Sequence, residues 1–156
     1  MIESATSVAI EPIVKSLLVN LPVEAAFRLF TQETNRWWPL ATHSVFGKEA
    51  AGCHLEGRVG GRFYEIHQDG RQSDWGQVLV WEPPARMALT FHPGRAPDQA
   101  TELEITFQTE SKGTRLTLIH RGWERCAPEV RARRDGYERG WDHVLQQYLS
   151  QAAAAK

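Results

Sequence analysis

Cysteine is scarce in this chain of 156 residues, which contains only Cys53 and Cys126. The two are far apart in the sequence and form no Cys-x-x-Cys pair, so we expect no disulfide framework. Isolated cysteines of this kind are typical of a reducing compartment, where buried thiols behave as small apolar side chains. We therefore expect two free thiols and a cytoplasmic location.

The chain also lacks long apolar runs and an excess of charge of one sign. No stretch approaches the ~18 consecutive apolar residues that a membrane-spanning helix needs. Residues 1–11 have no basic segment followed by an apolar stretch, so no signal peptide is predicted. The formal net charge of −1 and the isoelectric point near 6.6 do not favour binding to nucleic acid or to an anionic membrane. We expect a soluble protein whose partner is neither of these.

The composition is that of one globular domain. Hydrophobic residues make up 42% of the chain and charged residues 24%. A chain of this length buries about two-thirds of its surface, so it can hold a core without disulfides or metal. We expect a single domain over residues 10–150, with flexible tails at 1–9 and 151–156.

The first part of the chain predicts one strand and two short helices. Aliphatic and β-branched residues over 10–19 predict the strand. Pro22 suits the first position of a helix, and apolar residues at helical spacing extend it to about Thr31. A second short helix, or an irregular turn, is expected to end at Trp37-Trp38-Pro39.

Strand-like alternation replaces helical spacing after residue 54, and glycine and proline pairs divide it into six predicted strands. Their expected ranges are 54–58, 62–67, 73–81, 86–91, 101–108 and 114–121. Gly60-Gly61 is expected to form a bulge or sharp bend that curves the sheet. Pro128 can start a last helix, whose apolar stripe continues to about Ser150.

This order of elements predicts an α+β fold, with a curved seven-stranded antiparallel sheet around a long C-terminal helix. A twisted sheet of this size curls, and one straight helix cannot fill its concave side, so a cleft is expected between them. Gly136 and Gly140 leave one face of the helix bare. That face favours either close packing against a strand or room for a ligand.

Aromatic residues are spread over nearly every predicted element, including all six tryptophans. Large rings with a polar N–H suit the walls of an apolar pocket, although the same rings could simply fill the core. The residues that we expect to line such a pocket are Trp37, Trp38, Phe63, Glu65, His67, Trp75, Phe91, His120, Trp123, Tyr137 and Trp141.

Two of these residues are candidates for acid–base chemistry. His120 shares a strand face with Leu116 and Leu118, and it is either a core histidine with satisfied hydrogen bonds or a group that orients a ligand or shuttles a proton. Glu65 enters the pocket if its strand turns Phe63 and His67 inward, and burial would then raise its pKa toward the acid–base range. The opposite register would place Arg62 and Tyr64 in the pocket instead.

Other chemical signals are weak. The six histidines show no metal-ligand spacing, and the chain has no nucleophile elbow, phosphate-binding loop or dinucleotide motif, so neither a metal nor a cofactor is expected. Acidic residues are interleaved with several arginines at the start of the last helix, which predicts a solvated face. These arginines are Arg131, Arg133, Arg134 and Arg139.

Several motifs resemble the family of activator of heat-shock-protein-90 ATPase homologue-like proteins, within the START-like (SRPBCC) superfamily. They are RWWP at 36–39, VGGRFYE at 59–65, WGQVLVWEPP at 75–84, GTR at 113–115, HRGWE at 120–124, and GW at 140–141 with VL at 144–145. The match spans about residues 10 to 150 in the right order. The resemblance implies a helix-grip fold with a hydrophobic ligand cavity between the sheet and the C-terminal helix.

The resemblance implies no single reaction, so three hypotheses follow. The first is a binding module, rather than an enzyme, for a small apolar or aromatic molecule. The second is a cyclase, aromatase or dehydratase, as some START-like relatives are, with His120 and Glu65 as acid–base groups. The third is a chaperone accessory protein, but the eukaryotic activators use a separate N-terminal domain to dock, so a chaperone partner is not expected. The sequence does not decide whether the protein forms a homodimer.

Overall fold

The computed structural model describes residues 10–155 of the chain, so the tail expected at 1–9 and the last residue of the tail expected at 151–156 lie outside these residues. The strands are β2 (Ile13–Val19), β3 (Ala50–Leu55), β4 (Arg62–His67), β5 (Gln72–Glu82), β6 (Arg86–Phe91), β7 (Thr101–Glu110) and β8 (Gly113–Arg121). The α-helices are α1 (Val23–Thr31), α2 (Pro128–Arg131) and α3 (Arg134–Ala154). Short 3-10 helices are η1 (Thr34–Arg36), η2 (Gly47–Glu49), η3 (Pro97–Gln99) and η4 (Trp123–Arg125).

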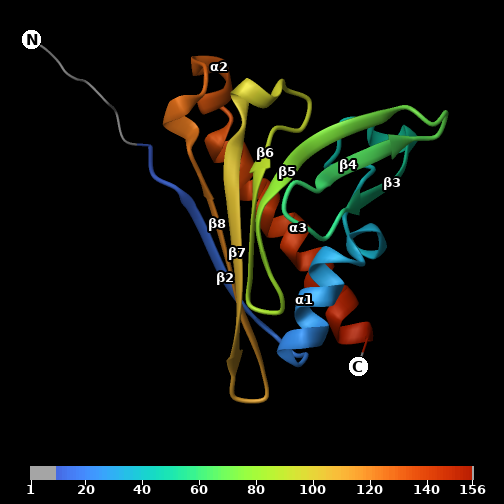
Figure 1. Cartoon of the computed structure of the whole chain (residues 1–156), viewed down its shortest axis with the longest axis vertical. Coiled ribbons are helices and arrows are strands. Elements are labelled where there is room, and N and C mark those ends of the chain that lie inside the picture. The colour runs from blue at the N-terminus through green and yellow to red at the C-terminus, as the bar shows by residue number, and fades with distance from the viewer. Residues whose placement is uncertain (1–9, 156) are drawn as a thin grey trace, which may run out of the picture.

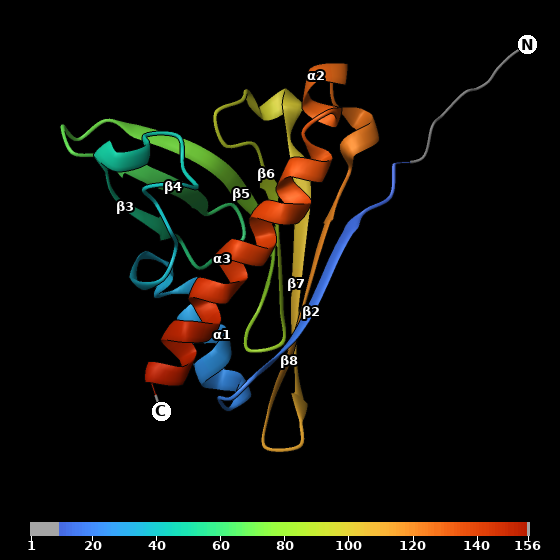
Figure 2. The ribbon, with the colours of Figure 1, turned by 180° about the vertical axis from the view of Figure 1, so that it is seen from behind.

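The seven strands form one antiparallel sheet in the order β2-β8-β7-β6-β5-β4-β3 (Figure 1). The first strand therefore pairs with the last, and Ile13 lies opposite His120. Figure 2 shows α3 running diagonally across one face of the sheet, with α1 beside the C-terminal half of α3. The α+β helix-grip prediction is confirmed. No helix in the described part of the chain has both the length and the apolar character needed to cross a membrane.

The sheet bends at three irregularities in strand pairing. Register shifts occur between Ala50 and Gly52, between Phe63 and Tyr64, and between Val78 and Val80. Bulges of this kind add an unpaired residue to one strand and increase the local twist. Of the bulge and the sharp bend that were predicted for Gly60-Gly61, the structure has the bend, because these glycines form the turn before β4 and the Gly61 N–H donates to the Arg58 carbonyl oxygen at 2.9 Å.

Several predicted boundaries also differ from the structure, and the first strand starts at Ile13 rather than at residue 10. The strand expected at 54–58 is β3, which begins at Ala50 because this segment pairs with β4. The last helix is broken after α2, and Ala132 and Arg133 separate it from α3. The tail expected from residue 151 continues α3 to Ala154, because alanine favours helix and Ala152 is buried in the core.

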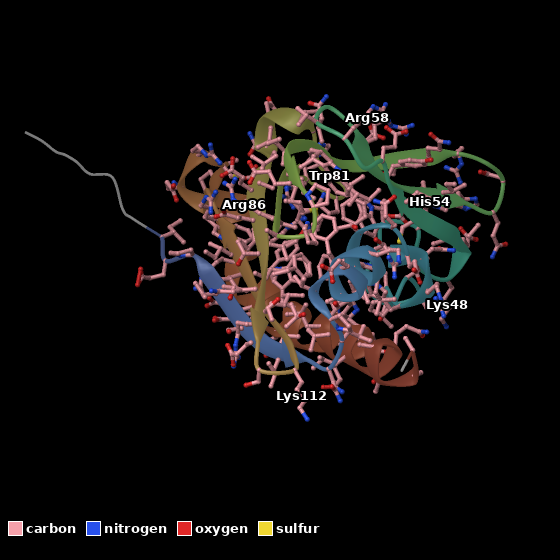
Figure 3. The ribbon with its side chains drawn as sticks, turned by 60° about the horizontal axis from the view of Figure 1, so that its bottom comes forward. Lys48, His54, Arg58, Trp81, Arg86 and Lys112 are labelled. Carbon is pink, nitrogen blue, oxygen red and sulfur yellow. The ribbon has the colours of Figure 1, made fainter. Side chains whose placement is uncertain are left out.

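The closely packed part of the core lies between α1, the sheet and the C-terminal half of α3. The Phe30 and Tyr148 rings meet edge to face at 5.2 Å, and Phe27 meets Phe107 at the same distance. The Tyr148 hydroxyl donates to the Ala26 carbonyl oxygen at 2.8 Å, which joins α3 to α1. Figure 3 shows side chains filling this space, with charged residues such as Lys112 extending outward.

Candidate ligand cavity

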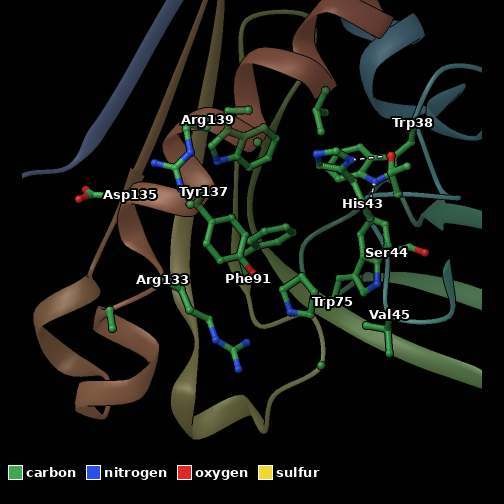
Figure 4. Close-up of a pocket in the computed structure, with 18 residues that line it drawn as sticks. Trp38, His43, Ser44, Val45, Trp75, Phe91, Arg133, Asp135, Tyr137 and Arg139 are labelled. Atoms are coloured by element: carbon green, nitrogen blue, oxygen red, sulfur yellow. Dashed lines mark hydrogen bonds between the residues drawn. The ribbon is translucent and has the colours of Figure 1, made fainter.

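A cavity of about 720 Å³ lies beside the N-terminal half of α3 (Figure 4). Residues 42–45, Trp75 on β5, the end of β6 with the turn after it, and residues 132–144 all contribute to its lining. Five aromatic side chains line it: Trp38, Trp75, Phe91, Tyr137 and Trp141. The volume falls within the range of about 300–1,000 Å³ that small-molecule sites have. The aromatic lining is also typical of such sites.

Two glycines of α3 keep this space open. A Cβ atom placed on Gly136 would meet no atom within 4 Å, and one on Gly140 would lie 3.6 Å from His43 Cδ2. Both glycines line the cavity. Of the two interpretations left open by the sequence, the structure therefore favours room for a ligand over close packing of the helix against a strand.

The aromatic rings support one another and hold the cavity walls in place. The Trp38 ring packs 5.0 Å from Trp75 and meets Trp141 edge to face at 5.8 Å. On the other side, Phe91 lies 5.9 Å from Trp141. The Trp38 indole also donates to the His43 carbonyl oxygen at 2.8 Å, which fixes the start of the loop over residues 39–46.

Glu65 faces inward, as one of the two predicted registers requires. It is fully buried on β4 and shares its face with buried Phe63, whereas Arg62 and Tyr64 lie partly exposed on the outer face. The Arg62 guanidinium stacks over the Tyr64 ring at 4.0 Å, away from the core. The register question is thus settled in favour of Glu65, but this residue does not line the cavity.

The Glu65 carboxylate instead organises the cavity wall. Its Oε1 accepts hydrogen bonds from the Trp75 indole at 2.6 Å and from the Val45 N–H at 2.7 Å. Its Oε2 accepts from the Phe46 N–H at 3.0 Å. Both oxygens are therefore occupied, and the carboxylate ties the loop over residues 39–46 to β4 and β5. Burial, together with the Glu65 charge, raises the pKa of the neighbouring Cys53 thiol to about 12.

His120 is also fully buried and lies behind the cavity wall. Its Nδ1 accepts from the Trp141 indole at 3.0 Å, so the ring hydrogen lies on Nε2, which is 2.6 Å from Thr101 Oγ1. Thr101 Oγ1 in turn donates to the Phe91 carbonyl oxygen at 3.0 Å. Burial, with Arg95 and Arg134 nearby, lowers the pKa of His120 to about 3. The neutral ring thus orients Trp141, and neither nitrogen is free for a ligand.

The other predicted site residues divide between the cavity and the core. Trp37 packs against Phe30 and Tyr148 in the filled core. Phe63 lies behind Trp75, at 4.8 Å, and Trp123 is fully buried. His67 bonds to Glu49 at 3.0 Å, away from the cavity. None of these four lines the cavity.

The sequence analysis missed His43, which lines the cavity from the loop after Trp38. Its ring stacks on His143 of α3 with a centroid distance of 4.8 Å, and Thr42 Oγ1 lies 2.7 Å from its Nδ1. Burial, together with the charge of His143, lowers the pKa of His43, so the imidazole is neutral at pH 7. Its position in an irregular loop left no periodic signal that could have identified it.

Arg133 and Arg139 also line the cavity, although the sequence placed them on a solvated face. Both are exposed, so the prediction of solvent contact was correct for part of each side chain. The interleaved pattern fits Arg134 best, because it pairs with Asp135 at 3.1 Å and with Glu138 at 2.8 Å. The edge of the cavity therefore carries positive charge.

Comparisons with known proteins place this geometry among relatives. A family model described as Activator of Hsp90 ATPase homolog 1-like protein matches residues 20–153. A solved structure described as the anthrahydroquino-gamma-pyrone synthase Txn09, complexed with SUM, is 32% identical, with 91% of this chain and 97% of that chain covered and a TM-score of 0.62. A search of curated proteins finds no match.

More distant structures share the fold. CalU16 from Micromonospora echinospora is 21% identical, with 90% of this chain and 74% of that chain covered and a TM-score of 0.61. The Aha1 dimer from Colwellia psychrerythraea is 13% identical, with 90% and 94% covered and a TM-score of 0.60. At these identities the similarity concerns the fold alone.

Proposed function

We propose that this chain, which belongs to the Activator of Hsp90 ATPase homolog 1-like family, binds a planar aromatic molecule between α3 and the sheet. The observation that carries the proposal is the 720 Å³ cavity walled by five aromatic side chains. Such rings favour another aromatic ring through stacked or edge-to-face contacts, in addition to the burial of apolar surface. The relative that is 32% identical is described as an anthrahydroquino-gamma-pyrone synthase. A fused-ring aromatic of that class is the ligand type that we infer for this cavity.

Intrinsic tryptophan fluorescence tests this proposal directly. Three of the six tryptophans line the cavity, Trp38, Trp75 and Trp141, so a bound ring system is expected to quench emission. Titration with 1,8-dihydroxyanthraquinone should quench saturably and raise the melting temperature, since a ligand that binds only the folded state stabilises it.

A cavity-filling variant provides the decisive control. Gly140→Leu places a side chain in the space beside His43 and should lower affinity at least about tenfold, because the ring then loses its site. Ala153→Leu adds the same side chain to an exposed position of the same helix and should bind like the original protein. The absence of quenching over a panel of fused-ring compounds, or equal binding by Gly140→Leu, would falsify the proposal.

A second candidate function is enzymatic, and His43 favours it. We infer that a neutral imidazole beside an aromatic-lined cavity could act as a general base on a bound polyphenol or ketone and promote ring closure. Thr42 Oγ1 lies at hydrogen-bond distance from Nδ1, which leaves Nε2 as the nitrogen that can face a substrate. Glu65 and His120 serve as positioning residues in this hypothesis, because their polar atoms already bond to the protein.

This candidate is tested by separating turnover from binding. His43→Gln should retain binding of the aromatic probe but lose the conversion of a polyketide-like substrate, and the rate of the original protein should fall as His43 is protonated. His143→Gln is the matched control, since His143 stacks on His43 but does not line the cavity. Unchanged turnover in His43→Gln would rule out this role.

A further inference from the structure

Two arginines at the edge of the cavity lack acidic partners in the described part of the chain. Within residues 10–155, neither Arg133 nor Arg139 forms an ion pair with an acidic side chain. Arginines on the outer face of the sheet are paired, as Arg62 is with Asp74 at 2.8 Å and Arg121 is with Glu102 at 2.9 Å. The positive charge beside the cavity is therefore left uncompensated by the described part of the protein.

The acidic residue of the cavity lining does not neutralise this charge. The Asp135 side chain is 80% exposed and pairs with Arg134 at 3.1 Å. Figure 4 shows its carboxylate pointing away from the Tyr137 and Phe91 rings, whereas the Arg133 side chain extends toward the same open space as Tyr137. His43 on the opposite wall is neutral at pH 7, because burial and His143 lower its pKa.

Tyr137 adds a polar group to the cavity lining. Its hydroxyl oxygen accepts a hydrogen bond from Arg95 Nη1 at 3.0 Å. Because that contact uses a lone pair of the oxygen, the hydroxyl hydrogen stays available for an acceptor in the cavity. The cavity thus combines an apolar interior with hydrogen-bond donors and positive charge along one edge.

We propose that the natural ligand is an aromatic carboxylate, whose fused rings lie among Trp75, Phe91 and Trp141 while its carboxylate bonds to Arg133, with the Arg139 charge adding attraction at longer range. This rests on the proposed function and specifies its substrate class. A guanidinium presents N–H donors in a planar fork that matches a carboxylate, and such charge-assisted bonds are stronger than neutral ones. An uncharged aromatic would leave the exposed Arg133 guanidinium bonded to water instead of to a carboxylate.

A matched pair of probes tests the carboxylate site. Anthraquinone-2-carboxylate and anthraquinone-2-carboxamide have the same ring system and a planar substituent of similar size, but only the first is charged at pH 7.5. In tryptophan-fluorescence titrations of the full chain at about 0.05 M salt, the carboxylate is expected to bind about tenfold more tightly. The preference should shrink at about 0.5 M salt, because screening shortens the range of the exposed charges.

Charge-removing variants then assign the preference to these residues. The double variant Arg133→Gln/Arg139→Gln should bind the two probes with nearly equal affinity, because the charge that distinguishes them is gone. The control is Arg125→Gln/Arg131→Gln, which removes the same net charge from two exposed or half-buried arginines that do not line the cavity. This control should keep the preference for the carboxylate.

The outcomes separate this inference from the proposed function. Equal affinity of the two probes for the original protein, or a preference that survives in Arg133→Gln/Arg139→Gln, would overturn the carboxylate site and leave the aromatic cavity standing. Loss of the preference in both double variants would assign it to net charge and would also overturn the site. Failure of both probes to bind would overturn the proposed function itself.

Discussion

The two halves of α3 face the same sheet, but they enclose very different amounts of space. Around the C-terminal half, Leu145, Tyr148 and Ala152 are buried, and none of them lines the cavity. Around the N-terminal half, the cavity measures about 720 Å³. Because backbone geometry is similar along a helix, the difference must arise from the side chains and from what covers each half.

Both factors are visible in the sequence of the helix and its neighbours. Helix α1 packs on the C-terminal half through Phe30 and Ala26, which contact Tyr148. The N-terminal half presents Gly136 and Gly140 and is covered by a loop rather than by a helix. The molecule thus combines a close-packed half that supplies stability with a hollow half that can supply binding.

The largest expected effect on stability comes from removing a buried side chain in the close-packed half of α3. Tyr148→Ala should lower the free energy of unfolding by about 3–5 kcal/mol, because it removes a fully buried ring and the hydrogen bond to Ala26. Urea denaturation monitored by circular dichroism measures this loss.

The matched change in the hollow half is Tyr137→Ala. Tyr137 is half-buried and lines the cavity, so its removal should cost only about 1–2 kcal/mol while weakening binding of the aromatic probe. Equal losses of stability in Tyr148→Ala and Tyr137→Ala would contradict the prediction that the C-terminal half of α3 contributes more to stability than the N-terminal half.

A smaller effect for each pH unit is expected from the titration of His120, which supports the hollow half through Trp141. Burial lowers the pKa of this folded-state histidine to about 3, against about 6.5 in the unfolded chain. Between these values the unfolded state binds the additional proton, so stability is complete above about pH 6.5 and falls by up to about 1.4 kcal/mol per pH unit toward pH 3.

The variant His120→Gln isolates this contribution. A glutamine amide could accept from the Trp141 indole and donate to Thr101 without titrating, so stability should depend less on pH between 6 and 4.5. Urea denaturation at a series of pH values measures both slopes. If the two proteins show the same slope, His120 is not the group that takes up the proton on unfolding.

The fold was predictable because its signals are local. Alternation predicted β6 with its observed bounds and β4 with its observed length, and helical spacing predicted α1. The apolar stripe predicted for the last helix is also present, since Trp141 and Tyr148 are both buried. Such patterns indicate which side of a helix or strand is buried, because they depend only on the spacing of apolar residues and not on which residues pack against that side.

The candidate site was only partly predictable, because burial and cavity lining are different properties. His120 and Glu65 point inward as their strands require, but hydrogen bonds to Trp141 and Trp75 place both behind the wall. Arg133 lines the cavity from the turn between α2 and α3, a break in the last helix that the sequence pattern did not predict. His43 lies in a loop, where no period constrains a side chain.

The smallest predicted effect on stability tests whether the face of α3 that carries Gly136 and Gly140 has room for a methyl group. Gly140→Ala should raise the free energy of unfolding by about 0.5–1 kcal/mol, because alanine favours the helix and its Cβ would lie at an ordinary 3.6 Å from His43 Cδ2. Thermal and urea denaturation measure the gain. The matched control is Gly76→Ala on β5, whose Cβ would lie 1.7 Å from the Thr90 carbonyl oxygen and should strongly destabilise the sheet. A loss of stability in Gly140→Ala would contradict this prediction. It would mean that another group packs against the bare face of α3 in solution and leaves no room for a methyl group.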